Sequence, residues 1–224
     1  MRLRTLPVSI AGVLYAGALG LLSWRFSPVP WAMCLVFALL AQVASNFANE
    51  YYDFKAGLDK AGRVGPRRGV TEGDITPQAM KCATYVTLGL ACVLGIALVA
   101  LYGEWWMYAV GVLTALGVVA YSSGPYPLSH HGWGEVAVVA FFGIVPVCLT
   151  YILMGGTGGW WLVAASVGIG LMGANVLVVN NYRDIEDDRA VGKRTLAVRL
   201  GLRGMASAVS YTHLRAHETV LDLV

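Results

Sequence analysis

The chain has 224 residues, of which 57% are hydrophobic and 13% charged, and its formal net charge is +3. A water-soluble fold needs more surface charge and a disordered chain is less hydrophobic, so this composition excludes both and predicts a protein of the lipid bilayer. The 27 glycines show no three-residue period and the apolar residues form no heptads, which excludes collagen and coiled coils.

Six apolar stretches are long enough to cross a bilayer, which takes about 20 residues per helix. We expect them at 6–24, 30–50, 78–101, 104–121, 134–153 and 160–181. Their connections are short except after the second and sixth stretches, where polar loops follow. The predicted fold is an all-α, polytopic transmembrane helix bundle.

Lys and Arg residues are unevenly distributed along the chain. Of the 16, 14 lie before the first stretch, between Lys55 and Lys81, or between Arg183 and Arg203. Because cytoplasmic loops carry an excess of positive charge, we expect the N-terminus and both long loops to be cytoplasmic, in a multi-pass protein of the inner (plasma) membrane. The second and sixth stretches would then end at one cytoplasmic pocket.

Polar side chains mark the end of the second stretch. Four of them are spaced i, i+3, i+4 and i+7 and therefore share one helical face, at Asn46, Asn49, Glu50 and Asp53. Gly57 is expected to end this helix and to let Asp59 turn back toward the same face.

The sixth stretch ends in a second acidic segment, in which Asp184 and Asp188 are one helical turn apart. Carboxylates at membrane depth are costly and repel one another, and a divalent cation removes both objections. Magnesium prefers oxygen ligands and typically binds through a few carboxylates and substrate phosphates. The sequence therefore predicts a Mg²⁺ site with ligands from Asn49, Glu50, Asp53, Asp59, Asp184 and Asp188.

Basic residues accompany both acidic segments. Arg offers paired planar donors to phosphate oxygens, and Lys offers a compact charge. We expect four of them to bind a diphosphate, namely Arg63, Arg68, Arg183 and Lys193. If either loop is considered alone, the alternative is that its charged residues are exposed to water and serve only to set the membrane topology.

Further polar and aromatic residues near these segments are candidates for binding an organic substrate: Asn46, Asn49, Tyr52, Tyr121 and Asn181. The alternative is interhelical hydrogen bonding for Asn46 and Asn49, and packing or an interfacial position for the tyrosines. The His130-His131 pair is interpreted as a surface pair, since no third metal ligand lies nearby.

These segments resemble the two Asp-rich motifs of the UbiA superfamily of intramembrane aromatic prenyltransferases, which close the second and sixth of nine helices. Asn49-Glu50-Tyr51-Tyr52-Asp53 resembles the first motif, with Glu50 where Asp is usual. The segment from Arg183 to Asp188, followed by Lys193-Arg194-Thr195, resembles the second. The resemblance implies a Mg²⁺-dependent enzyme with catalytic carboxylates at Asp53, Asp59, Asp184 and Asp188.

Within the superfamily, Gly57-Leu58-Asp59, the string from Arg63 to Gly69 and the string from Asn180 to Asp184 are most similar to the menaquinone branch. This implies transfer of a polyprenyl group from polyprenyl diphosphate to 1,4-dihydroxy-2-naphthoate, with release of diphosphate and CO₂, to give demethylmenaquinone. The implied partners are both substrates and the lipid bilayer, and no nucleic acid is expected.

Two other functions remain open, and the motif of a third is absent. The first alternative is prenyl transfer to another aromatic acceptor of the superfamily (4-hydroxybenzoate, homogentisate or a chlorophyll precursor). An ion-coupled transporter also uses intramembrane carboxylates, but usually near the midplane of broken helices. A phosphatidyltransferase of the CDP-alcohol kind binds magnesium with Asp residues, but its Asp-Gly start followed by Ala-Arg is absent.

The C-terminal segment breaks the apolar pattern. The run from Val209 to Thr219 resembles the translation of a sequencing adapter, and it stands where a seventh span is expected. We therefore expect residues 1–208 to be a partial prenyltransferase domain that lacks about three helices of the family bundle, and residues 209–224 to be an artefactual tail.

Overall fold

The structure is a computed structural model that describes residues 5–59, 67–201 and 203–205. Helices account for most of this part of the chain, which contains no strands, so the all-α prediction is confirmed. The labelled α-helices are α1 Leu6–Leu22, α2 Pro28–Lys55, α3 Pro77–Tyr102, α4 Trp106–Ala120, α5 Gly134–Val138, α6 Val145–Leu153, α7 Trp160–Arg183 and α8 Ile185–Ala190. Residues 196–201 and 203–205 are also helical. The prediction for residues 209–224 lies outside the described residues.

The six predicted spans each correspond to a helical segment, but two are shorter than expected. α2, α3, α7 and the continuous segment Gly134–Leu153 are long and apolar enough to cross a membrane. α1 and α4 have 17 and 15 residues. At about 1.5 Å per residue, α4 covers about 22 Å of a hydrocarbon core about 30 Å thick.

Prolines set the start of two long helices. Pro28 and Pro77 occupy the first helical position of α2 and α3, where the missing N–H group would have no helical partner. Thr76 adds a cap to α3, because its Oγ1 accepts a hydrogen bond from the Ala79 amide at 3.2 Å.

The span Gly134–Leu153 is interrupted by a π-helical segment, Val139–Ile144, between α5 and α6. This segment packs directly on α7: a Cβ placed on Gly143 would lie 2.5 Å from the Gly170 Cα atom. Because apolar burial does not drive helix association within lipid, small residues that let backbones touch are a main source of packing energy.

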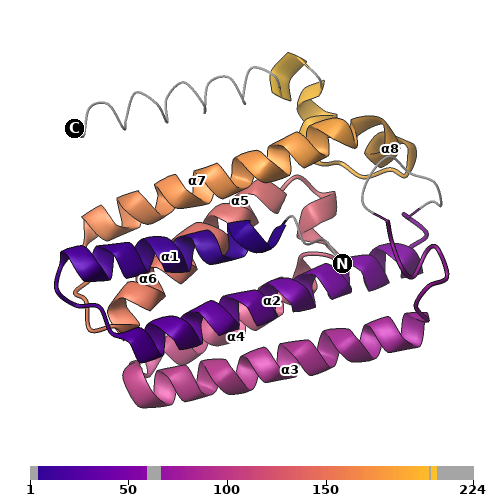
Figure 1. Cartoon of the computed structure of the whole chain (residues 1–224). Coiled ribbons are helices and arrows are strands. Elements are labelled where there is room, and N and C mark those ends of the chain that lie inside the picture. The colour runs from indigo at the N-terminus through magenta and orange to yellow at the C-terminus, as the bar shows by residue number, and fades with distance from the viewer. Residues whose placement is uncertain (1–4, 60–66, 202, 206–224) are drawn as a thin grey trace.

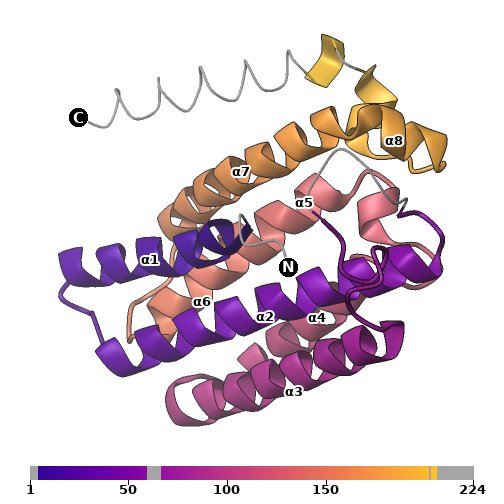
Figure 2. The same ribbon diagram turned by 45° about the vertical axis from the view of Figure 1, so that its right-hand side comes forward.

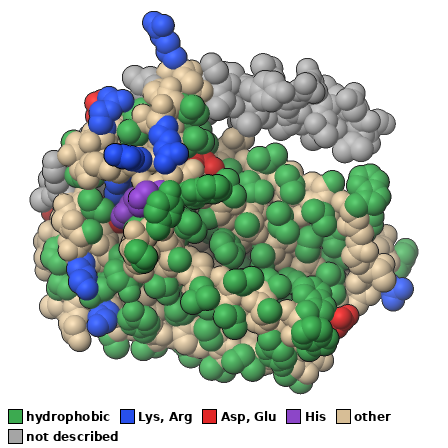
Figure 3. All heavy atoms as spheres, turned by 180° about the vertical axis from the view of Figure 1, so that it is seen from behind, with side chains coloured by type: hydrophobic (Ala, Val, Ile, Leu, Met, Phe, Trp, Pro, Cys, Tyr) green, Lys and Arg blue, Asp and Glu red, His purple; other side chains and the backbone are tan. Residues whose placement is uncertain are grey.

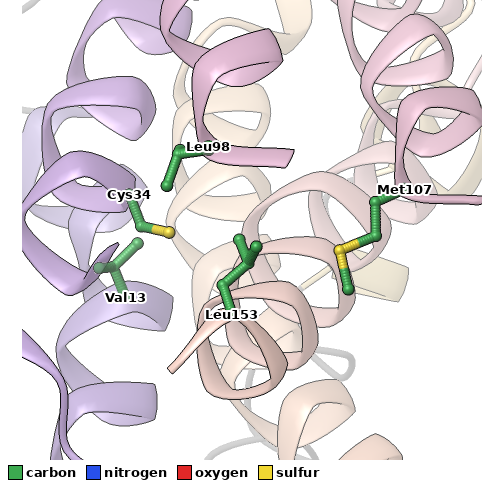
Figure 4. Close-up of a cluster of buried hydrophobic side chains, with 5 residues drawn as sticks. All are labelled: Val13, Cys34, Leu98, Met107 and Leu153. Carbon is green, nitrogen blue, oxygen red and sulfur yellow. The ribbon is translucent and has the colours of Figure 1, made fainter. Parts of the chain in front are cut away.

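The apolar interior joins five helices. Val13, Cys34, Leu98, Met107 and Leu153 form one buried cluster, with one residue from each of α1, α2, α3, α4 and α6 (Figure 4). Their contacts contribute dispersion energy and fix how the helices pack.

The C-terminal ends of α2 and α7 lie at the same end of the bundle, beside α8 (Figures 1 and 2). Seen from behind, Lys, Arg and His side chains gather mainly at this end, while hydrophobic side chains cover most of the remaining face (Figure 3). The charged end therefore carries both acidic segments, and the rest of this face suits contact with lipid.

Candidate functional site

A cavity of about 500 Å³ opens between the charged ends of α2 and α7. It is lined by residues of both acidic segments and by their basic neighbours: Asn46, Asn49, Asp53, Arg68, Arg183, Asp184, Asp188 and Lys193. Residues more than a hundred positions apart in the sequence thus share one polar space.

Asp53 is the most enclosed carboxylate of this cavity, with only 1% of its surface exposed in the last turn of α2. Lys193 Nζ lies 3.2 Å from its Oδ2 atom, and His130 Nε2 lies 3.2 Å from its Oδ1 atom. Arg68 Nη2 is 3.7 Å from Oδ2. A buried carboxylate is tolerated only with such partners, and here they come from three separate loops.

Lys193 also connects the two acidic segments. Its Nζ atom lies 3.9 Å from Asp188 Oδ1 as well as 3.2 Å from Asp53 Oδ2. One ammonium group therefore contacts both carboxylates, and the segments that carry them meet at this side chain.

The end of α2 brings Asp59 back toward the helix. Gly57 has φ +70°, a left-handed conformation that favours glycine, and the Leu58 amide donates to the Asp53 carbonyl at 2.9 Å. Asp59 Oδ2 then lies 3.4 Å from Arg68 Nε. The same guanidinium thus lies between Asp53 and Asp59.

The second acidic segment is held mostly by its own neighbours. Arg183 donates two hydrogen bonds to Asp184, from Nε to Oδ1 at 2.6 Å and from Nη2 to Oδ2 at 2.9 Å. After α8 the chain turns at Gly192, with φ +77°, and the Lys193 amide donates to the Asp188 carbonyl at 2.9 Å. This turn directs Lys193 into the cavity.

Glu50 and Asp59, predicted as metal ligands, and Tyr52, predicted as a substrate contact, do not line this cavity. The Glu50 carboxylate accepts a hydrogen bond from the Val70 amide. The Tyr52 hydroxyl is hydrogen-bonded to that of Tyr85 on α3, at 2.9 Å. Adjacent helical residues are about 100° apart around the axis, so Tyr52 cannot share the direction of Asp53. Arg63 lies outside the described residues.

The other predicted substrate residues line the cavity and belong to hydrogen-bond networks. Asn46 and Gln42 both donate to Thr5 Oγ1, at 3.2 and 2.9 Å. Asn49 Nδ2 donates to Ser122 Oγ at 3.0 Å, and Asn181 Nδ2 donates to Glu135 Oε1 at 2.9 Å. Tyr121 lines the cavity from the end of α4.

The surface-pair interpretation is wrong for His130, which the structure places against Asp53 with 14% of its side chain exposed. Its loop is attached to the chain after α8, because the Arg194 amide donates to the His130 carbonyl at 2.8 Å and Arg199 Nη2 donates to the His131 carbonyl at 2.9 Å. Sequence reasoning missed His130 because no local spacing relates it to Asp53, which is 77 residues away.

An apolar cavity of about 590 Å³ adjoins the polar one. Five residues line both cavities, namely Gln42, Ser45, Tyr121, Val138 and Phe142. A ligand with a charged head and an apolar tail would find matching surroundings in the two spaces.

The sequence matches the UbiA prenyltransferase family over residues 5–214. A 1,4-dihydroxy-2-naphthoate octaprenyltransferase of Escherichia coli (strain K12) is 38% identical over 206 residues, which cover 90% of this chain and 67% of that protein. The protein of the same name from Mycobacterium tuberculosis is 39% identical over 202 residues, which cover 89% of this chain and 68% of that protein.

Among solved structures, a UbiA homologue from Archaeoglobus fulgidus bound to DMAPP and Mg²⁺ superposes with a TM-score of 0.70 and 13% identity. The superposition covers 95% of this chain and 70% of that chain, so the two share a fold. The resemblance read from the two acidic motifs is confirmed, and the chain belongs to the UbiA prenyltransferase family.

Proposed function

We propose that this protein transfers a polyprenyl group from polyprenyl diphosphate to 1,4-dihydroxy-2-naphthoate, with release of diphosphate and CO₂, as a step of menaquinone synthesis. The names of its relatives from Escherichia coli and Mycobacterium tuberculosis support this acceptor. The observation that carries the proposal is that Lys193 contacts both the Asp53 and the Asp188 carboxylate on the wall of one cavity.

The donor groups of the cavity fit a magnesium diphosphate better than a metal ion alone. Among the described residues, no three Asp, Glu, His or Cys side chains form a group that could hold a metal ion. Magnesium commonly binds through a few carboxylates together with substrate phosphates, which agrees with carboxylates that are interleaved with Lys and Arg. Together with phosphate oxygens of the substrate, the carboxylates of Asp53, Asp184 and Asp188 would provide the ligands of Mg²⁺, which when bound would neutralise charge on the departing diphosphate.

The basic side chains of the cavity would bind the phosphate oxygens. Lys193 supplies a point charge, and Arg183 supplies a planar pair of donors. When the allylic C–O bond breaks, its electron pair leaves with the diphosphate, and these cations stabilise that charge in a partly enclosed site.

The apolar cavity would hold the polyprenyl chain beside the cleaved bond. Its lining excludes water from the allylic cation, so the electron-rich naphthoate ring is the available nucleophile. A C–C bond then forms with the ring, and the ring carboxylate leaves as CO₂.

The acceptor would bind where the two cavities meet. Asn46, Asn49, Tyr121 and Asn181 provide hydrogen-bonding groups and one aromatic face. The Gln42 Oε1 atom is buried here and has no hydrogen-bond partner among the described residues. A hydroxyl group of the acceptor would satisfy this atom, which is otherwise costly to bury.

The enzyme would work at the cytoplasmic side of the inner membrane. The basic residues of both long loops favour this orientation. Among the described ones, Arg68, Arg183 and Lys193 line the cavity, and Lys and Arg side chains gather mainly at one end of the bundle (Figure 3).

Acceptor identity is tested with the chain produced in membranes and supplied with labelled polyprenyl diphosphate and Mg²⁺. We expect labelled product with 1,4-dihydroxy-2-naphthoate and none with 4-hydroxybenzoate or homogentisate. Transfer to one of the latter alone would overturn the acceptor and retain the prenyltransferase.

Metal dependence is tested in the same assay by chelation with EDTA. We expect diphosphate release to stop and to return when Mg²⁺ is added back. Unchanged release in EDTA would contradict the proposed role of the acidic residues.

A further inference from the structure

Glu50 occupies a position where the family motif usually has Asp, yet it does not line the polar cavity, and its carboxylate accepts a hydrogen bond from the Val70 amide. We propose that Glu50 is a positioning residue: its carboxylate holds the turn from Arg67 to Ile75 against α2 and thereby places Arg68 on the first acidic segment.

The contact between Glu50 and the turn is buried and direct. The Val70 amide donates to Glu50 Oε1 at 3.1 Å, and Glu50 and Val70 are 3% and 4% exposed. The chain passes closely over the carboxylate at Gly69, where a Cβ would lie 3.4 Å from the same oxygen. A buried amide of this kind is costly to leave without its acceptor.

The turn is also closed by bonds of its own, so it can be held as one unit. The Glu72 amide donates to the Arg68 carbonyl at 2.9 Å, and the Ile75 amide donates to the Gly69 carbonyl at 3.1 Å. Fixing Val70 to α2 therefore fixes the position of Arg68, two residues earlier.

The turn, held in this way, positions the Arg68 guanidinium beside the first acidic segment. Arg68 is buried, donates from Nη1 to Asn49 Oδ1 at 3.1 Å, and lies 3.4 Å from Asp59 and 3.7 Å from Asp53. A buried guanidinium is stabilised by carboxylates only in good geometry, so a displaced turn would disturb both acidic residues. Glu50 thus acts on the diphosphate site through Arg68.

A positioning residue and a magnesium ligand at position 50 require different properties of the side chain. The first depends on its length and the second on its charge. An Asp at position 50 keeps the charge but is one C–C bond, about 1.5 Å, too short to reach the Val70 amide from the same backbone. A Gln keeps the length and an accepting oxygen but loses the charge. A positioning residue tolerates Gln, whereas a magnesium ligand tolerates Asp.

The experiment compares Glu50→Asp and Glu50→Gln in the full chain in detergent, with Glu72→Asp as the control in the exposed part of the same turn. Hydrogen exchange of peptides over residues 67–76 is measured by mass spectrometry, together with the KM for polyprenyl diphosphate. For Glu50→Asp we expect exchange about tenfold faster and a KM about tenfold higher. Glu50→Gln should stay within about threefold of the parent chain in both, and Glu72→Asp should not differ from it.

Exchange over α7 shows whether each variant is folded. Parent-like exchange over 67–76 in Glu50→Asp, or a larger effect of Gln than of Asp, would overturn the inference. The inference about Glu50 rests on the proposed function only where the KM values are used, because the exchange measurement needs no activity. Accelerated exchange in Glu50→Asp, with no prenyl transfer by the parent chain, would support the inference and refute the proposed function alone.

Discussion

The two acidic segments of this protein are neutralised in different ways. Asp53, in the first, is buried and contacts side chains from three separate loops, two of which are distant in sequence. Asp184, in the second, is bound by the adjacent Arg183. In α8, the ion pair Glu186–Arg189 joins two exposed side chains three residues apart. The first segment is preorganised by the tertiary fold, whereas the second is largely arranged by local sequence.

This difference has an energetic consequence. Removing one partner of a buried charge cluster leaves the remaining charges without an opposite charge, which typically lowers the free energy of unfolding by about 3–5 kcal/mol. Exposed pairs are screened by water and contribute about 0–1 kcal/mol. Changes in the first segment should therefore affect both folding and activity, and changes in the second mainly activity.

The largest effect is expected for Asp53→Asn. This change keeps the side-chain size but leaves Arg68 and Lys193 beside a neutral amide, so we expect prenyl transfer to fall at least about 100-fold and the melting temperature in detergent to fall. Initial rates at equal protein concentration and thermal unfolding measure the two effects. Parent-like activity would remove Asp53 from the mechanism.

A smaller effect is expected for Asp188→Asn. Asp188 lies 3.9 Å from Lys193, which keeps its closer contact of 3.2 Å with Asp53 when Asp188 is changed. Loss of the Asp188 charge should therefore raise the Mg²⁺ concentration for half-maximal activity about tenfold, with little change in melting temperature. Titration of Mg²⁺ in the transfer assay measures this. A loss of stability as large as that of Asp53→Asn would contradict the contrast between the segments.

Substitutions of His130 test the contact that joins the first acidic segment to a loop distant in sequence. His130→Ala removes one hydrogen bond to a buried carboxylate, and we expect transfer to fall about fivefold. His130→Gln, which can still donate to Asp53, should restore most of the rate. If both variants are equally impaired, the ring itself is required rather than its hydrogen bond.

Substitution of Arg199 should have the smallest effect on the rate of prenyl transfer. Arg199→Met removes an exposed hydrogen bond to the His131 carbonyl, and a fall of about twofold in transfer is expected. In the double variant with His130→Ala the two effects should not add, because Arg199 would act through the His130 loop. A double-mutant cycle with additive losses would rule out this connection.

Much of the fold could be predicted from the sequence, because each bilayer helix must be a long apolar segment that satisfies its own backbone hydrogen bonds. The six segments are found where hydropathy predicts them. The sequence did not reveal the π-helical segment Val139–Ile144, because its residues are as apolar as their neighbours and its position depends on contact with α7.

The site was predictable where it depends on helical periodicity or on short-range turns. Asn46, Asn49 and Asp53 share one face of α2, and Gly57 turns the chain toward Asp59. Glu50 has the same periodic spacing but contacts Val70, since a nearby loop covers it. Periodicity defines a direction around a helix and says nothing of what lies in that direction.

By itself, the sequence determined that this protein is a membrane helix bundle with two acidic segments near one side, because hydropathy and charge act along the chain. Only the tertiary structure decided which cations meet which carboxylates. Lys193, Arg68 and His130 reach Asp53 through loop conformations. Such contacts depend on distances in space that no local spacing encodes, since a buried charge is stabilised by whichever partner the packed loops bring within a few ångströms.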